Sequence, residues 1–235
     1  MRINVLQHTP NEGPGMIQQW SNEHDHQMYV YHPYQYGFLP TAKETDMLVI
    51  LGGPMSPNDD LDWIKQERSL IKELLDQDKP IFGACYGAQQ IVKTMGYEVK
   101  KAPAKEVGWG PVYRRDTRIL DIPEELTVLH WHEEMFEVPD EAQLLFSNDN
   151  LENQGFVMNH RVIGLQFHIE PAADNVREMV VNDFPYIKGS VLNQTANEIL
   201  SEPVPNQNKI ENYKNKLATC PKINTKYIST RKVHF

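Results

Sequence analysis

The stretch that decides the fold is PIFGACYGAQ, residues 80–89. An apolar run enters it, and a helical pattern with Ile91, Val92 and Met95 follows it. A strand that turns directly into a helix leaves no room for flanking side chains, so small residues stand two positions before and two after Cys85. Such a turn exposes the sulfur at the amino end of a helix, where oriented amides favour the thiolate. The alternative is a buried structural cysteine between helix-packing glycines.

Strands and helices alternate along the first hundred residues. Apolar runs predict strands at residues 3–6, 28–31, 47–51 and 80–82, and helical patterns occupy residues 15–20, 61–75 and 86–95. Asp59 and Asp60 are N-cap candidates for the second of these helices, and Gly96 ends the third. This alternation predicts an α/β fold with a mostly parallel sheet and helices on both faces.

The rhythm becomes β-rich between residues 97 and 167. Short strands are expected at residues 112–113, 127–129, 144–146, 156–158 and 162–165, followed by helices at residues 174–183 and 191–200. We expect one domain over residues 1–200, in which the β-rich part is a small extension of the sheet. Beyond it, residues 201–235 hold one last helix near residues 210–217 and a basic, poorly ordered tail at residues 219–235.

Composition excludes several classes of function. The chain of 235 residues is 40% hydrophobic, enough for a core, but its longest apolar run at residues 47–51 is far too short to span a bilayer. A net charge of −9 argues against nucleic-acid binding. No amino-terminal signal is visible, and the only cysteines are Cys85 and Cys220. A disulfide framework is therefore not expected, and a cytoplasmic setting is.

Among the nine histidines, His168 in GLQFHIEP (residues 164–171) has the best setting for catalysis. A thiol nucleophile needs a base, and that base needs an orienting acceptor on its other ring nitrogen. His168 ends an apolar strand, and Glu170 projects to the same side if the strand persists. The pair predicts a base with its orienting carboxylate. For this segment alone, an ordinary strand-end histidine with a solvated glutamate is the alternative.

Two further segments flank this chemistry. Gly52 and Gly53 open the stretch GGPMS after the third strand, where a backbone amide, that of Gly53 by preference, could join the Tyr86 amide as an oxyanion donor. A plain turn is the alternative. EVGWG at residues 106–110 is either a turn with a packed tryptophan or a pocket wall.

The stretch HWHEE at residues 130–134 offers a rival cluster. His130 and His132 share one face of a strand and, with Glu134, could be metal ligands. No third ligand at a recognisable spacing and no His-Glu-x-x-His helix accompany them, so we expect no metal. We expect His132 to line the pocket near the thiol instead.

Together, these motifs resemble the class I glutamine amidotransferase family. They come in its order: Gly-Gly-Pro, then Gly-x-Cys-x-Gly-x-Gln, then His-x-x-Asp/Glu, then Gln-Phe-His-x-Glu, over roughly residues 1–200. The resemblance implies the flavodoxin-like fold of that family. It implies Cys85 as nucleophile, His168 as base and Glu170 as orienting carboxylate.

The resemblance also implies the rest of the pocket. The amides of Gly53 and Tyr86 would hold the oxyanion, and Gln89 would contact the glutamine substrate. We assign Gly52 and His132 to substrate binding as well, and expect no cofactor.

Within the family, the chain looks most similar to stand-alone proteins that resemble the amidotransferase domain of GMP synthase. The stretches that carry this resemblance are HTPNEGPG at residues 8–15 and EVGW at residues 106–109. Trp131-His132-Glu133-Glu134 departs from the Ser-His-Gly-Asp of that domain, so its partner contacts do not transfer. Tyr86 replaces the commoner leucine beside the thiol.

The leading hypothesis is glutamine hydrolysis through a γ-glutamyl thioester, with ammonia passed to a synthetase in trans. One alternative keeps the triad but hydrolyses a γ-glutamyl peptide or conjugate. Related cysteine-elbow peptidases are disfavoured because the histidine segment lies far downstream of the elbow. A catalytically silent regulatory or binding subunit is a third class. The ammonia acceptor and the oligomeric state, including a homo-oligomer, stay open.

Overall fold

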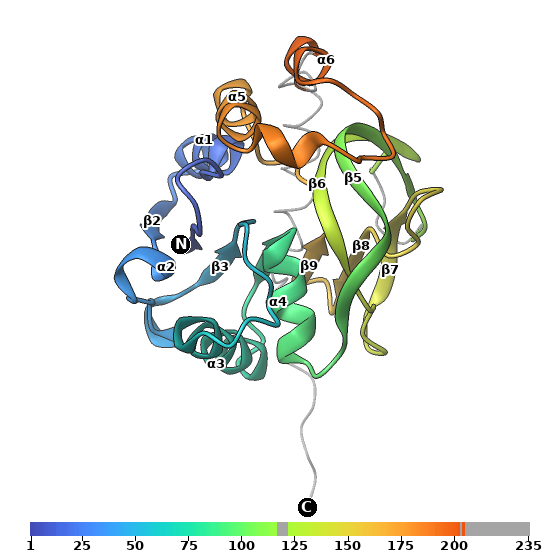
Figure 1. Ribbon diagram of the computed structural model, residues 1–235. Coiled ribbons are helices and arrows are strands. Elements are labelled where there is room, and N and C mark those ends of the chain that lie inside the picture. The colour runs from blue at the N-terminus through green and yellow to red at the C-terminus, as the bar shows by residue number, and fades with distance from the viewer. Residues whose placement is uncertain (117–121, 203, 205–235) are drawn as a thin grey trace, which may run out of the picture.

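A computed structural model describes residues 1–116, 122–202 and 204 of the chain. Its centre is a nine-stranded sheet in the order β2-β1-β3-β4-β9-β8-β7-β5-β6 (Figure 1). The strands are β1 (Arg2–Leu6), β2 (Gln27–Tyr31), β3 (Met47–Ile50), β4 (Ile81–Ala84), β5 (Val99–Arg114), β6 (Glu125–Phe136), β7 (Gln143–Ser147), β8 (Gly155–Met158) and β9 (Val162–Leu165).

The sheet has a parallel half and an antiparallel half. Strands β2, β1, β3, β4 and β9 run parallel, and from β9 onward every neighbouring pair is antiparallel. The parallel half has the strand order of flavodoxin-like folds. The predicted α/β class, with a parallel sheet and a β-rich extension, is therefore confirmed.

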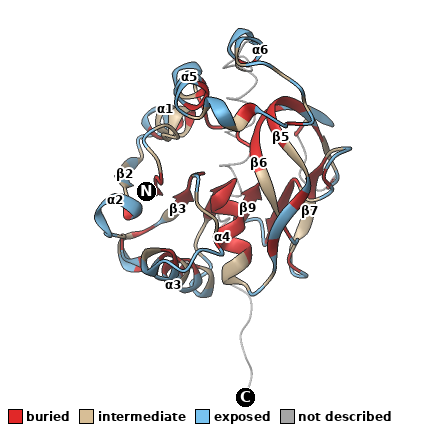
Figure 2. Ribbon diagram, in the orientation of Figure 1, coloured by how far each residue is buried: buried red, intermediate tan, exposed pale blue. Residues whose placement is uncertain are grey.

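Helices cover both faces of the parallel half. The helices are α1 (Gly15–Glu23), α2 (Pro33–Tyr36), α3 (Asp62–Asp76), α4 (Tyr86–Thr94), α5 (Ala173–Asn182) and α6 (Ala196–Ser201), with short 3-10 turns η1 (Ala42–Glu44) and η2 (Phe184–Ile187). Strand β3 packs against helices on both faces of the sheet. Leu48 and Ile50 pack with α3 and α4, whereas Val49 packs on the other face with Trp20 of α1. Successive strand residues point to opposite faces, so this strand is buried on both (Figure 2).

A third apolar cluster anchors the carboxyl-terminal helices. It joins Trp109 and Trp131 of the β5–β6 hairpin to residues of α5 and α6, among them Val176, Met179 and Ile199. The indole nitrogen of Trp109 donates to the carbonyl of Ile199 at 3.0 Å. The predicted helix at residues 174–183 is thus confirmed.

Several local expectations were wrong. β5 and β6 are long strands rather than short ones, because they pair with each other from Val99–Phe136 to Tyr113–Glu125, across an irregularity after Lys101. The expected helix at residues 191–200 begins only at Ala196, with Thr195 as its N-cap. A short sequence pattern does not show which segment a strand will pair with. Pairing within a hairpin can extend a strand through prolines and glycines.

The expected caps of α3 were also wrong. The helix begins after Leu61 without a side-chain cap. The Asp59 carboxylate accepts the Ser56 amide in the preceding turn, and Asp60 pairs with Lys65. The predicted helix at residues 210–217 and basic tail at residues 219–235 lie outside the described residues. Among the residues that are described, no helix combines the length and apolar character needed to cross a membrane.

Helix α4 approaches strand β3 so closely that only glycine fits at position 87. A Cβ atom there would overlap the carbonyl oxygen of Ile50 and lie 2.7 Å from its carbonyl carbon. Since both atoms belong to the backbone, relief requires that the helix move away from the sheet. The same close packing sets the position of Cys85, one residue before the helix.

We therefore expect Gly87→Ala to destabilise the protein by about 1–3 kcal/mol, because overpacking outweighs the gain of about 1 kcal/mol in helix propensity. Urea denaturation followed by circular dichroism measures the change. Gly13→Ala is the control, since its new Cβ would lie 3.4 Å from the nearest atom. Equal midpoints for Gly87→Ala and the unmodified protein would contradict this packing argument.

Candidate active site

Cys85 occupies a strained turn between β4 and α4. Its backbone has φ 50° and ψ −111°, a conformation that non-glycine residues rarely adopt. The Cys85 amide donates to the carbonyl of Leu165 in β9 at 2.7 Å, which fixes the turn to the sheet. Tyr86 is the first residue of the helix, and amides in a first helical turn have no acceptors within the helix. The sulfur thus lies beside a group of unpaired donors.

His168 and Glu170 lie together beyond the end of β9. His168 Nδ1 is 2.5 Å from Glu170 Oε1, and both residues are buried. The strand ends at Leu165, so the expected strand geometry does not align them. A β-bridge between His168 and Leu129 holds the histidine, and the Ile169 amide donates to Glu170 Oε2 at 3.0 Å. Glu170 therefore orients the imidazole through Nδ1.

The charge of Glu170 controls the imidazole. Burial alone would lower the pKa of His168, but the Glu170 carboxylate, joined by an interaction with Cys85, raises that pKa well above 6.5. Nε2 of His168 is buried and has no hydrogen-bond partner among the described residues. An imidazolium with one free N–H, close to a sulfur, stabilises a thiolate and can deliver a proton.

Two further groups touch the sulfur. Cys85 Sγ is 3.8 Å from the carbonyl oxygen of Trp131, and Gln166 Nε2 donates to Sγ at 3.8 Å. Gln89, on the second turn of α4, donates to Gln166 Oε1 at 3.2 Å. Gln89 is buried and is linked to the thiol through Gln166. Gln166 had not been singled out, although it belongs to the same short motif as His168.

The Gly-Gly loop after β3 packs directly against this group. A Cβ atom on Gly52 would lie 2.8 Å from His168 Cε1, and one on Gly53 would lie 2.8 Å from the Cβ of His8. His8 supports this loop, because its Nδ1 is 3.1 Å from the carbonyl oxygen of Leu51 and its Nε2 is 3.0 Å from Glu67 Oε2. Only glycines allow this approach of backbone to the imidazole.

Glu12 is a site residue that the sequence analysis missed. Its Oε2 would overlap a Cβ atom on Gly52, and the same Cβ position lies 2.8 Å from His168 Cε1, so the carboxylate lies beside the imidazole on one side of the loop. Desolvation raises the pKa of Glu12, and the nearby charge of His168 only partly opposes this. The Pro-x-x-Gly-Pro-Gly loop around it was noted only as a family resemblance, and no periodic pattern marks a loop carboxylate.

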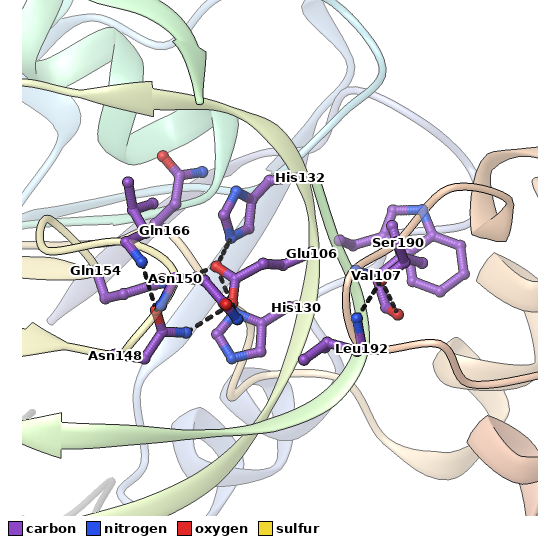
Figure 3. Close-up of polar contacts among 12 residues, drawn as sticks. Glu106, Val107, His130, His132, Asn148, Asn150, Gln154, Gln166, Ser190 and Leu192 are labelled. Carbon is purple, nitrogen blue, oxygen red and sulfur yellow. Dashed lines mark hydrogen bonds and ion pairs between the residues drawn. The ribbon is translucent and has the colours of Figure 1, made fainter. Parts of the chain in front are cut away.

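His132 faces Glu106, in a buried cluster that also contains His130 (Figure 3). His132 Nε2 is 3.3 Å and His130 Nδ1 is 3.8 Å from Glu106 Oε2. Burial lowers the pKa of His130 to about 3. Burial would raise the pKa of Glu106, but the two histidines outweigh it and lower that pKa to about 2. Glu134, the third ligand considered from sequence, instead accepts a hydrogen bond from Ser56 at 2.9 Å.

The structure thus brings together the residues that the sequence analysis selected from distant segments. The Gly52–Gly53 loop, the Cys85 turn, and His168 with Glu170 lie at the carboxyl ends of β3, β4 and β9. Ligands of open α/β sheets bind at this edge. A buried thiol, an imidazole with an orienting carboxylate and free amides suit nucleophilic attack on a carbonyl carbon.

Comparison with known proteins agrees with this assignment. The family model described as glutamine amidotransferase class-I matches residues 19–185. The chain belongs to the class I glutamine amidotransferase family.

Among individual relatives, the chain is 28% identical to the glutamine amidotransferase-like protein YfeJ of Salmonella typhimurium, over 77% of this chain and 80% of that protein. It is 33% identical to a glutamine-hydrolysing GMP synthase subunit from Sulfolobus acidocaldarius, over 54% of this chain and 69% of that one. It is 25% identical to γ-glutamyl peptidase 4 of Arabidopsis thaliana, over 61% and 62%.

The fold agrees with a solved relative as well. The crystal structure of a glutamine amidotransferase from Methylobacillus flagellatus superposes with a TM-score of 0.87 at 27% identity, covering 99% of this chain and 97% of that one. The flavodoxin-like amidotransferase fold is therefore shared.

We expect Glu170→Gln to lower the pKa of His168, because the carboxylate that opposes the effect of burial is then lost. A pKa raised by folding stabilises the protein fully below the unfolded value, and the contribution is lost as pH rises through the folded pKa. Glu170→Gln should therefore be most destabilising on the acid side. Imidazole NMR titration and urea midpoints on both sides of pH 6.5 measure these effects.

Glu23→Gln is the matched control, since Glu23 is exposed and accepts a hydrogen bond from Gln19 on the surface of α1. It should leave the His168 titration unchanged. An unshifted His168 resonance in Glu170→Gln would show that Glu170 does not hold the charge of the imidazole.

Proposed function

We propose that the protein hydrolyses the side-chain amide of glutamine to glutamate and ammonia, with Cys85 as nucleophile, His168 as base and Glu170 as orienting carboxylate. The main support is the 2.5 Å contact between His168 and Glu170, beside a strained cysteine turn at a helix amino terminus. Membership of the class I family supports the choice of glutamine.

In the first step, the Cys85 thiolate attacks the side-chain carbonyl carbon of glutamine. The carbonyl oxygen becomes an oxyanion, and the amides of Gly53 and Tyr86 donate to it. The C–N bond then breaks, and the leaving nitrogen takes a proton from His168 Nε2 and departs as ammonia. The remaining γ-glutamyl group is bound to Cys85 as a thioester.

In the second step, the now neutral His168 takes a proton from water, and the hydroxide attacks the thioester carbon. The C–S bond breaks, glutamate leaves, and the thiolate and imidazolium are restored. Glu170 stabilises the imidazolium in both steps, as the acidic member of a triad does. Gly52 and Gln89 complete the pocket in this proposal, with Gln89 nearest to the sulfur network, whereas His132, expected there from sequence, faces Glu106 instead.

The ammonia acceptor would belong to a separate synthetase. Similarity to a protein that is itself named as one subunit of a GMP synthase supports a partner in trans. The isolated chain would then work slowly until that partner binds.

A γ-glutamyl peptide is the second candidate substrate. The similarity to γ-glutamyl peptidase 4 favours it, because the same thioester chemistry releases an amine in place of ammonia. A comparison of kcat/KM for glutamine and for γ-glutamyl dipeptides decides between them. A strong preference for glutamine would end this second candidate.

Replacement of the nucleophile tests the proposal directly. Cys85→Ala should reduce glutamate release at least about 10³-fold, because loss of one member of a catalytic triad removes most of its effect. Diazo-oxo-norleucine, a glutamine-like electrophile, should add one adduct to Cys85, located by mass spectrometry.

Cys220→Ser is the control for both measurements, since it removes the other thiol of the chain. It should retain both the activity and the adduct. Unchanged turnover in Cys85→Ala, or labelling that persists without Cys85, would overturn the proposal. Labelling detects a competent nucleophile even where turnover awaits a partner.

A further inference from the structure

The cluster of Glu106, His130 and His132 contains a buried carboxylate whose ion-pair partners are two imidazoles. The Glu106 side chain has no exposed surface, and within the described residues its ion-pair partners are His130 and His132 alone. Burial of an ionised carboxylate is costly unless it is paired or bound to a metal. The ion pairs of Arg2, Lys65, Lys72, Lys100 and Arg161 are with other carboxylates.

Three amides already hold the carboxylate in one orientation. Asn148 and Asn150 donate to Oε1 at 2.7 and 3.0 Å, and Gln154 donates to Oε2 at 2.6 Å (Figure 3). These amides come from the segment that connects β7 to β8, whereas Glu106 is on β5. Hydrogen bonds of this kind orient carboxylate ligands in metal sites.

The imidazoles leave their nitrogens without hydrogen bonds. Apart from the ion pairs with Glu106, all four ring nitrogens of His130 and His132 are buried and lack a hydrogen-bond partner among the described residues, and so does Oε1 of Gln154. Three of these atoms, His130 Nε2, His132 Nδ1 and Gln154 Oε1, also lack an ion pair, and because buried polar atoms in native proteins are nearly always satisfied, they call for an explanation. Lone pairs on neutral imidazole are metal ligands.

The spacing of these groups suits a small cation. One donor atom from each of Glu106, His130 and His132 lies within 4.8 Å of the others, and the pairs to Glu106 are 3.3 and 3.8 Å apart. Four ligands arranged tetrahedrally around zinc at about 2.1 Å stand roughly 3.4 Å from one another. A small inward movement of these side chains would bring their donor atoms to the spacing found around zinc.

We propose that Glu106, His130 and His132 bind a zinc-type divalent cation, with the unpartnered carbonyl oxygen of Gln154, whose amide nitrogen contacts Glu106, as the candidate fourth ligand. Two imidazoles and one carboxylate favour zinc over magnesium or calcium, which prefer oxygen ligands. The cation would tie the β5–β6 hairpin to the β7–β8 connection. It would also stiffen β6, where Leu129 holds His168 and the Trp131 carbonyl contacts Cys85. The site is separate from the triad, and its existence does not depend on the proposed reaction.

The test uses the full chain carrying Cys85→Ala, so that the thiol of the active site cannot bind the metal. Because the cluster is buried, the protein is refolded with zinc, dialysed, and analysed for bound metal by mass spectrometry. The expected result is one zinc per chain and a thermal midpoint raised by several degrees. A cobalt-loaded sample should show the absorption of a site with nitrogen and oxygen ligands and no thiolate band.

Variants locate the cation. Glu106→Gln and His130→Gln should each weaken zinc binding at least about 100-fold in a competition with a chromophoric chelator. His26→Gln is the control, because the rings of His24 and His26 lie 6.1 Å apart near the surface and could bind zinc adventitiously. It should leave the stoichiometry unchanged.

Two results would overturn the proposal. One is a folded, zinc-treated Cys85→Ala chain without bound metal, which requires no variant of the cluster. The other is zinc that survives Glu106→Gln and His130→Gln, or that is lost in His26→Gln, since either places the cation elsewhere.

Discussion

The structure depends on one steric constraint, the contact of helix α4 with strand β3 at Gly87. Because the helix backbone nearly touches the Ile50 carbonyl, the chain has no space to leave β4 gradually. It turns within one residue, and Cys85 takes up the positive φ that this demands. The cost of such a conformation is about 1–3 kcal/mol, sustained by the packing around it. In return, the sulfur stands at the amino end of a helix beside amides without acceptors.

The second feature of the molecule is the number of ionisable groups buried close to that turn. His8 with Glu67, His168 with Glu170, and the Glu106 cluster are all nearly excluded from water. Each carboxylate is matched to an imidazole, because a buried charge without a partner would destabilise the fold. The pairs have different consequences. His8 supports the Gly-Gly loop, whereas Glu170 raises the pKa of His168.

Sequence patterns were informative where structure is local. Alternating strands and helices predicted the parallel half of the sheet, since each unit buries its own apolar face. They failed in the β5–β6 hairpin, whose length depends on pairing between residues far apart, such as Val99 and Phe136. They also missed Glu12, a loop carboxylate with no periodic pattern around it. For the same reason Glu134 was considered beside the histidines, although Glu106, from the neighbouring strand β5, occupies that place.

The sequence by itself determined the elbow at Cys85, the order of the motifs and the class of fold, because tight turns and strand–helix alternation impose residue types locally. Only the tertiary structure decided which ionisable groups lie close enough to influence one another's protonation. His168 is aligned by a bridge to Leu129 and not by the continuation of its own strand, and three amides from another connection surround Glu106. Protonation depends on burial and distance through space, and neither follows from the spacing of residues along the chain.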